Sequence, residues 1–195
     1  MKYNFNLKRE YKKSWNYIKE SKNFIYLIIG IFIVFILVGF FIPTPQSVVE
    51  QILKFIKELL EKTQNMSQGE LIRFILLNNS QTSLFGIIFG VLLGIFPIIA
   101  TIINGYLLGF VASISVEREG FIILWKLLPH GIFELPAIFI SFGLGLKFGT
   151  FIFRKNKSKS FREYLINSLR VFLFIILPLL IIAAIIEGTL IFIYK

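Results

Sequence analysis

The stretch that decides the fold is FIYLIIGIFIVFILVGFFI, residues 24–42, in which none of the 19 side chains is charged. As an α-helix it would extend about 28 Å, close to the thickness of the hydrocarbon core of a bilayer. The run is too long for the core of a signal peptide, and Phe41, Ile42 and Pro43 end it without a small-residue cleavage site. We therefore predict a retained transmembrane helix over 24–42.

The composition of the whole chain also indicates a membrane protein. Of its 195 residues, 56% are hydrophobic and 16% are charged, a balance more apolar than that of soluble domains. The net charge of +10 comes from cations that flank apolar runs, where they are typical of membrane topology signals. We expect the lipid bilayer as partner and no nucleic acid. The absence of Cys excludes thiolate metal sites and thiol nucleophiles, and no cofactor is predicted.

Three later apolar runs complete the predicted fold, an all-α membrane protein with about five membrane segments. Residues 83–115 are interrupted by Pro97 and by Asn104-Gly105, which predicts two short helices in a Gly-rich hairpin. That hairpin either crosses the membrane or is re-entrant. Residues 132–153 and 171–194 predict two more spans, and 83–153 together form the expected central core.

Two basic segments set the predicted orientation. Residues 1–23 and the loop 154–170 are rich in Lys and Arg, which the positive-inside rule places in the cytoplasm. We therefore expect a multi-pass protein of the cell membrane with a cytoplasmic N-terminus and an external C-terminus. Residues 1–23 predict either an interfacial basic amphipathic helix or a solvated tail.

The segment 43–82 carries balanced charges and is expected outside. Its apolar residues from Val48 to Leu60 recur at helical spacing, and Ser67 with Glu70 predicts a capping box for a second short helix. These two amphipathic helices would bind partner proteins, cover the bundle or lie on the lipid headgroups.

Small residues recur four apart in three predicted helices, an arrangement that lets helix backbones approach closely in lipid. The three rows are Gly86, Gly90 and Gly94; Gly105, Gly109 and Ser113; and Ala137, Ser141, Gly145 and Gly149. We predict that they pack against each other or against a second subunit. A homo-oligomer, most simply a dimer, is expected.

The sharpest polar motif is Pro129-His130-Gly131-Ile132-Phe133-Glu134-Leu135-Pro136-Ala137. On a helix, His130 and Glu134 would share one face, and ionisable groups at membrane depth are functional candidates. Three interpretations stay open for this pair, namely a polar clamp, a proton or ion site, and a metal site.

Other polar groups join this motif as candidates for a polar core. Glu187 interrupts the last span, and Asn79 and Asn104 are potential partners for a membrane carboxylate. With one His, no Cys and no Asp, the chain lacks a catalytic triad and the usual ligands of a catalytic zinc. We predict no catalytic residue, no metal site and no enzymatic activity.

The motif His130-Gly131 with Glu134, Pro136 and Ala137 resembles the signature of the stage II sporulation protein M family of polytopic membrane proteins. The resemblance covers essentially the whole chain. The matching positions are Asn79, Asn104, Gly105, Gly109, His130, Gly131, Glu134, Pro136, Ala137, Gly143 and Glu187. The family's namesake is similar to a membrane scaffold that associates with two peptidoglycan-degrading proteins and is not itself hydrolytic. The resemblance implies a nonenzymatic assembly role.

Two functions follow as hypotheses. The first is a scaffold that assembles unidentified partner proteins through its outer helices or basic segments. The second is a transporter or channel with Glu134, His130 and Glu187 in a central pathway, because interrupted helices and ionisable groups are typical of transporter sites.

Overall fold

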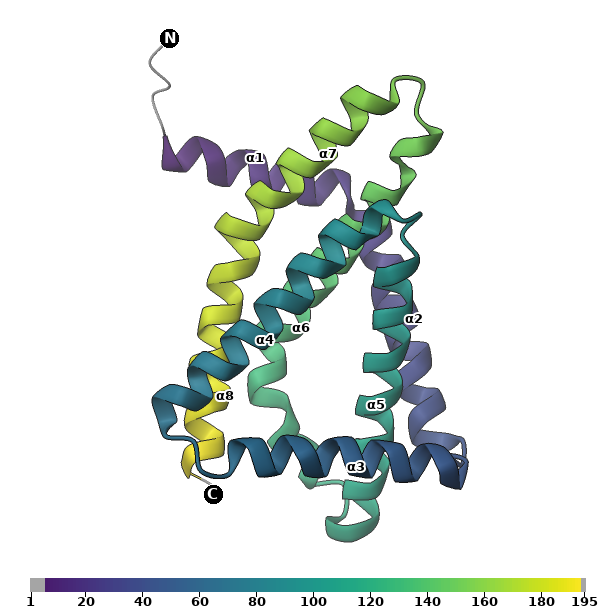
Figure 1. The fold of residues 1–195 in the computed structure, drawn as a ribbon, viewed down its shortest axis with the longest axis vertical. Helices are drawn as coiled ribbons and strands as arrows, with labels where there is room; N and C mark the ends of the chain where they lie inside the picture. Colours follow the sequence, from purple (N-terminus) through teal and green to yellow (C-terminus); the bar gives the residue numbers. More distant parts are fainter. Residues whose placement is uncertain (1–5, 194–195) are drawn as a thin grey trace.

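The computed structural model describes residues 6–193, except for the side chains of 123–130. This part of the chain is helical, with no strand (Figure 1). Its α-helices are α1 (Leu7–Glu20), α2 (Lys22–Phe41), α3 (Gln46–Thr63), α4 (Gln68–Ile88), α5 (Ile95–Glu119), α6 (Ile123–Gly149), α7 (Lys157–Val171) and α8 (Leu177–Ile193). Short turns of other helix types, η1 (Phe89–Val91), η2 (Thr150–Phe153) and η3 (Phe172–Ile176), connect some of them. The expected all-α class is confirmed.

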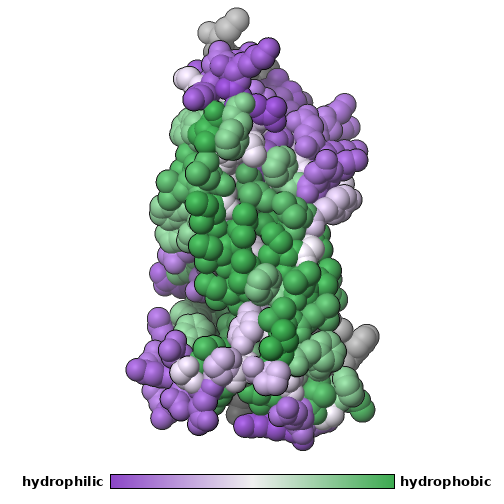
Figure 2. Space-filling model, turned by 90° about the vertical axis from the view of Figure 1, so that its right-hand side faces the viewer, coloured by the Kyte–Doolittle hydropathy of each residue, from purple (hydrophilic) through white to green (hydrophobic). Residues whose placement is uncertain are grey.

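The long helices run between two ends of the molecule, and α1 and α3 lie across opposite ends (Figure 1). Helix α2 packs along α5, while α4 packs along α8 and α6. A hydrophobic band separates two hydrophilic ends (Figure 2). Five helical stretches in the described part of the chain are long and apolar enough to cross a membrane: Lys22–Phe41, Gln68–Val91, Ile95–Glu119, Gly131–Phe153 and Lys157–Ile193. The first contains nearly all of the span predicted at 24–42.

Helix α4 begins at the predicted capping box and then differs from the prediction. The backbone N–H of Ser67 donates to Glu70 Oε2 over 2.8 Å, which confirms the box. The helix was expected to be short and external, but it continues unbroken through the boundary expected at 82 and ends at Ile88. Its buried residues Leu71, Ile75 and Ser83 face the bundle, so tertiary packing holds the polar run 78–82 in one helix.

The turn inside the apolar stretch 83–115 is at Leu93 and Gly94, whose φ angles are 57° and 71°. The expected break at Asn104-Gly105 is wrong, because both residues lie inside α5. Asn104 instead donates its side-chain amide to the Ala100 carbonyl over 2.7 Å, within its own helix. Pro97 occupies the first turn of α5, where its missing N–H leaves no helical bond unmade. The two helices of the hairpin, expected to be short, are therefore long: α4 has 21 residues and α5 has 25.

The basic segment 154–170 is mostly helical and not a loop. Asn156 caps α7 by accepting a hydrogen bond from the Lys159 N–H over 3.1 Å. Helix α7 then continues through the π-helical turn η3 into α8. Pro178 at the start of α8 has no N–H to donate to Phe174, which accounts for an irregular turn at this place.

The core lies around the second half of α6. Every residue from 141 to 149 is buried, with α2, α4, η1 and α8 packed around this segment. The largest buried side chains there are Phe142, Leu144 and Phe148. The centre of the bundle at this level is filled by α6 itself.

Candidate functional site

Two of the three small-residue rows face each other. A Cβ added to Gly90 would fall on the backbone of Gly145, one on Gly145 would meet the Gly86 carbonyl, and one on Gly149 would meet the backbone of Gly94. The hydroxyl of Ser141 also donates to the Ser83 carbonyl, and Ala137 is completely buried. The α4–η1 arm and α6 are therefore in backbone contact, which only residues without large side chains allow.

The third row packs elsewhere. A Cβ on Gly105 would lie 2.8 Å from the Phe32 carbonyl oxygen, and one on Gly109 would fall on the backbone of Ile36. Both neighbours belong to α2, which contributes its own Gly39 against Tyr106. Ser113 is half-buried. The prediction that the three rows pack against each other or against a second subunit is wrong for this one, because its glycines pack on α2.

A cavity of about 290 Å³ lies between α2, α5 and α6. Most of its wall is apolar, but Asn104 and Thr101 of α5 and the half-buried Glu134 of α6 also line it. Gly131 of α6 also lines this cavity. The structure thus brings Asn104, Gly131 and Glu134 of the family motif to one cavity, which has the mixed lining typical of ligand pockets.

Two other motif residues are outside this cavity, and one cannot be placed. Pro136 is exposed, and Ala137 is buried among the core residues. The side chain of His130 lies outside the described residues, so the clamp, ion-site and metal-site interpretations of His130 and Glu134 stay predictions. In the part of the chain with described side chains, no three His, Asp or Glu residues gather as a metal site would require.

Glu187 and Asn79 are not among the residues that line the Glu134 cavity. Glu187 is on α8, and its Oε2 is buried without a hydrogen-bond partner in the described structure. Asn79 is half-buried on α4 and accepts a hydrogen bond from the Asn78 amide over 3.4 Å. The polar residues predicted from the sequence are therefore spread over separate places in the bundle.

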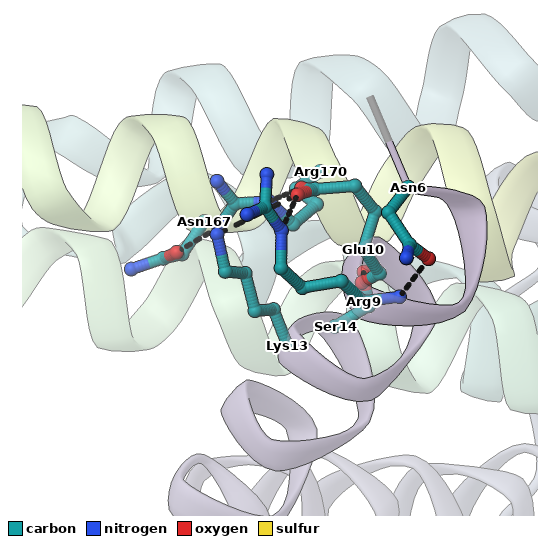
Figure 3. A network of polar contacts seen from close by, with 7 residues as sticks. All are labelled: Asn6, Arg9, Glu10, Lys13, Ser14, Asn167 and Arg170. Carbon is teal, nitrogen blue, oxygen red and sulfur yellow. Dashed lines mark hydrogen bonds and ion pairs between the residues drawn. The ribbon is translucent and has the colours of Figure 1, made fainter. Parts of the chain in front are cut away.

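A polar contact that the sequence did not reveal joins α1 to α7 (Figure 3). The buried Glu10 accepts a hydrogen bond from Arg170 Nε at 2.7 Å, and its other oxygen lies 3.5 Å from Lys13 Nζ and 3.6 Å from Arg9 Nε. Burial alone would raise the pKa of Glu10, but the hydrogen bond and charge of Arg170, with Lys13, outweigh burial and lower it. Glu10 therefore stays ionised and holds α1 on α7.

A second unpredicted contact attaches α1 to α6. Lys147 is 6% exposed, and its Nζ donates to Ser21 Oγ over 3.0 Å. The same Nζ lies 3.9 Å from the centre of the Tyr17 ring and 5.5 Å from that of Tyr164 on α7. Aromatic rings attract a buried cation in this geometry. Burial also raises the pKa of Tyr17 above its ordinary value, so this ring stays neutral. Three segments therefore meet at Lys147.

The five spans and the hydrophobic band define an all-helical, multi-pass membrane protein. The sequence pattern of the stage II sporulation protein M family matches residues 28–190, and the chain belongs to that family. An uncharacterized protein of Methanocaldococcus jannaschii is 35% identical over 114 residues, which cover 52% of this chain and 48% of that protein. The matched region thus spans about half of that relative. No solved structure matches the chain.

Proposed function

We propose that this protein is a nonenzymatic membrane scaffold that assembles partner proteins through α3. The observation that carries the proposal is the contrast between α6 and α3. Every residue of the segment 141–149 of α6 is buried and the segment fills the centre of the bundle, whereas α3 has no buried residue. The chain belongs to the stage II sporulation protein M family, and the assembly role that the resemblance implies supports the same proposal.

Helix α3 has the surface that such a role needs. It lies across one end of the molecule (Figure 1), and Leu53, Phe55, Leu59 and Leu60 are between 40% and 62% exposed. Charged residues alternate with these side chains along the helix. A cavity of about 600 Å³ separates Val48, Ile52 and Phe55 from α5, so α3 is not packed tightly on the bundle. An amphipathic helix held in this way can present its apolar side to a groove in a partner.

Site-specific photo-crosslinking in cells tests this role. A crosslinker at Leu60 on α3 is compared with one at Leu173 on the lipid-facing side of η3, which is exposed to a similar degree. We expect Leu60 to yield the same protein adduct in each repeat and Leu173 to yield lipid adducts. Lipid adducts alone at both positions would refute a protein-binding role for α3. The mass of the particle in mild detergent would show whether the adduct is a second copy of the chain.

The orientation belongs to the same proposal. Cations gather on α1, on α7 and in the turn before α7, at the end opposite α3: Lys8, Arg9, Lys12, Lys13, Lys19, Arg154, Lys155, Lys157, Lys159, Arg162 and Arg170. The positive-inside rule then puts this end in the cytoplasm and α3 outside, with α4 and α5 both crossing completely. Single-cysteine variants test the orientation because the chain has no Cys. An impermeant maleimide on intact cells should label Lys57→Cys and spare Lys12→Cys; the reverse pattern would invert the topology.

The Glu134 cavity favours transport as a second candidate function. Glu134, Asn104 and Thr101 provide polar groups in an otherwise apolar cavity between three spans. If a substrate or ion passes there, Glu134→Gln should change flux in proteoliposomes while assembly with partners is unaffected. Unchanged flux in Glu134→Gln and in a cavity-filling Val111→Phe variant would eliminate this candidate and leave the scaffold proposal standing.

A further inference from the structure

The outer surface of α1 presents two rows of side chains, one apolar and one basic, that lie mostly outside its contacts with the bundle. Its protein-facing row is polar and consists of Glu10, Ser14 and Tyr17, all buried, with Ser21 continuing the row. This placement is unusual, because amphipathic helices normally bury their apolar side. Of the apolar side chains of α1, Ile18 packs against the core, whereas Leu7, Tyr11 and Trp15 stay exposed.

The apolar row consists of Leu7, Tyr11 and Trp15, which are 55%, 41% and 52% exposed. Their spacing of four residues puts them on one line next to the protein-facing row. The ring of Tyr11 packs edge-on against Phe174 of η3, with ring centres 5.7 Å apart. Leu173, beside Phe174, is 56% exposed in the last membrane-spanning stretch. The apolar row of α1 is therefore continuous with the surface that faces lipid.

The basic row consists of Lys8, Lys12 and Lys19, all exposed. Their spacing of four and seven residues aligns them on the side of the apolar row that faces away from the bundle. Around the helix, the order is thus protein contact, apolar row, lysine row and then the remaining polar residues. A helix lying in the membrane interface has this order, with the apolar row among acyl chains and the lysines at headgroup level.

We propose that this surface of α1 binds anionic phospholipids, with Leu7, Tyr11 and Trp15 inserted at the level of the upper acyl chains and Lys8, Lys12 and Lys19 contacting phosphate headgroups. The partner is the lipid surface itself, because the apolar row joins the lipid-facing side of η3 and the lysine row complements anionic headgroups. Glu10, Arg170 and Lys147 fix the helix in this position from the protein side. The inference is independent of the scaffold proposal.

The test uses Trp15 as a fluorescent probe in the full-length chain. The sequence has two Trp residues, so a Trp125→Phe background leaves Trp15 alone. The protein is reconstituted into vesicles that mix phosphatidylglycerol and phosphatidylcholine, with bromine on the acyl chains of one lipid at a time and at equal mole fraction. We expect brominated phosphatidylglycerol to quench Trp15 at least about twofold more strongly than brominated phosphatidylcholine.

Two controls separate lipid selectivity from a general effect of charge. The Lys8→Gln, Lys12→Gln, Lys19→Gln variant should lose the preference, whereas Lys54→Gln, Lys57→Gln, Lys62→Gln on α3 should retain it. High salt should also reduce the preference for brominated phosphatidylglycerol in the protein that keeps its three lysines. This measurement does not depend on the folding of the triple variant. Equal quenching by the two lipids would refute anionic recognition. No quenching by either lipid would place α1 away from the bilayer and overturn the proposal.

Discussion

Glycines make the contact between α6 and the α4–η1 arm, whereas charged side chains make the contact between α1 and α7. In the first, Gly90 and Gly145 bring two backbones together in the interior of the bundle. In the second, Glu10 of α1 pairs with Arg170 of α7 (Figure 3). Hydrocarbon provides no hydrophobic force between apolar helices, so the first contact depends on shape. The second depends on ionisation, so the two should respond to different perturbations.

The largest effect is expected from adding one methyl group at Gly145. Its Cβ would clash with the Gly86 carbonyl oxygen, so backbone and not a flexible side chain would have to move. Overpacking of this kind costs about 1–3 kcal/mol. Thermal unfolding in detergent should show a clear loss of stability for Gly145→Ala.

Gly30 provides the matched control for this substitution. It is also inside a membrane-spanning helix, but an added Cβ there would have no neighbour within 4 Å. Gly30→Ala should therefore be neutral or slightly stabilising, because alanine favours a helix. If Gly145→Ala is as stable as Gly30→Ala, backbone contact is not what holds α4 and α6 together.

The contact between α1 and α7 should instead respond to pH. Arg170 and Lys13 lower the pKa of Glu10 below its ordinary value of 4.5 against the opposing effect of burial. A carboxyl with a lowered pKa stabilises the folded state above its unfolded pKa, and that stabilisation is lost as the pH falls through the folded value. We expect α1 to stay docked at neutral pH and to loosen only under acid conditions.

A spin label at Lys12→Cys would report this loosening as increased mobility on acidification. In a Glu10→Gln background, α1 should already be mobile at neutral pH and should respond little to acid. If acid mobilises both proteins equally, a group other than Glu10 controls the contact. The glycine contact should stay intact over the same pH range.

The smallest effect is expected for an ion pair on α3. Lys57 and Glu61 are 3.8 Å apart, with side chains 77% and 59% exposed. Exposed pairs one helical turn apart contribute about 0.3–0.5 kcal/mol. Lys57→Ala should therefore leave the unfolding temperature nearly unchanged. A loss comparable to that of Gly145→Ala would mean that this exposed lysine has a structural partner beyond Glu61.

The sequence was most informative where a local pattern determines the structure. The charge-free run 24–42 predicted α2, and Ser67 with Glu70 predicted the start of α4. The full length of α4 was not predicted because the polar run 78–82 lowers its hydropathy, although neighbouring helices hold it. The turn at Gly94 was missed because a glycine with positive φ and a packing glycine look identical in sequence.

Contacts between distant residues were beyond prediction for a different reason. Glu10 and Arg170 are 160 positions apart, and each looks like an ordinary charge near a membrane boundary. Lys147 lies inside the apolar run 132–153, where the sequence does not show what its ammonium group contacts, and it is buried on two tyrosine rings. Only the folded chain shows which cations lie inside. In the candidate site, the sequence identified Glu134 and Asn104 but could not show that they share a cavity while Glu187 is elsewhere.

The uninterrupted helical path from α7 through η3 to α8 has a mechanical consequence. It is 37 residues long, and a helix of that length extends about 55 Å, well beyond the roughly 30 Å of the hydrocarbon core. The α7 part of this path therefore extends beyond the hydrocarbon core, at the end of the molecule opposite α3 (Figure 1). A displacement of α7 would therefore be transmitted along the helix to α8, and η3 is the irregular turn at which the path would bend.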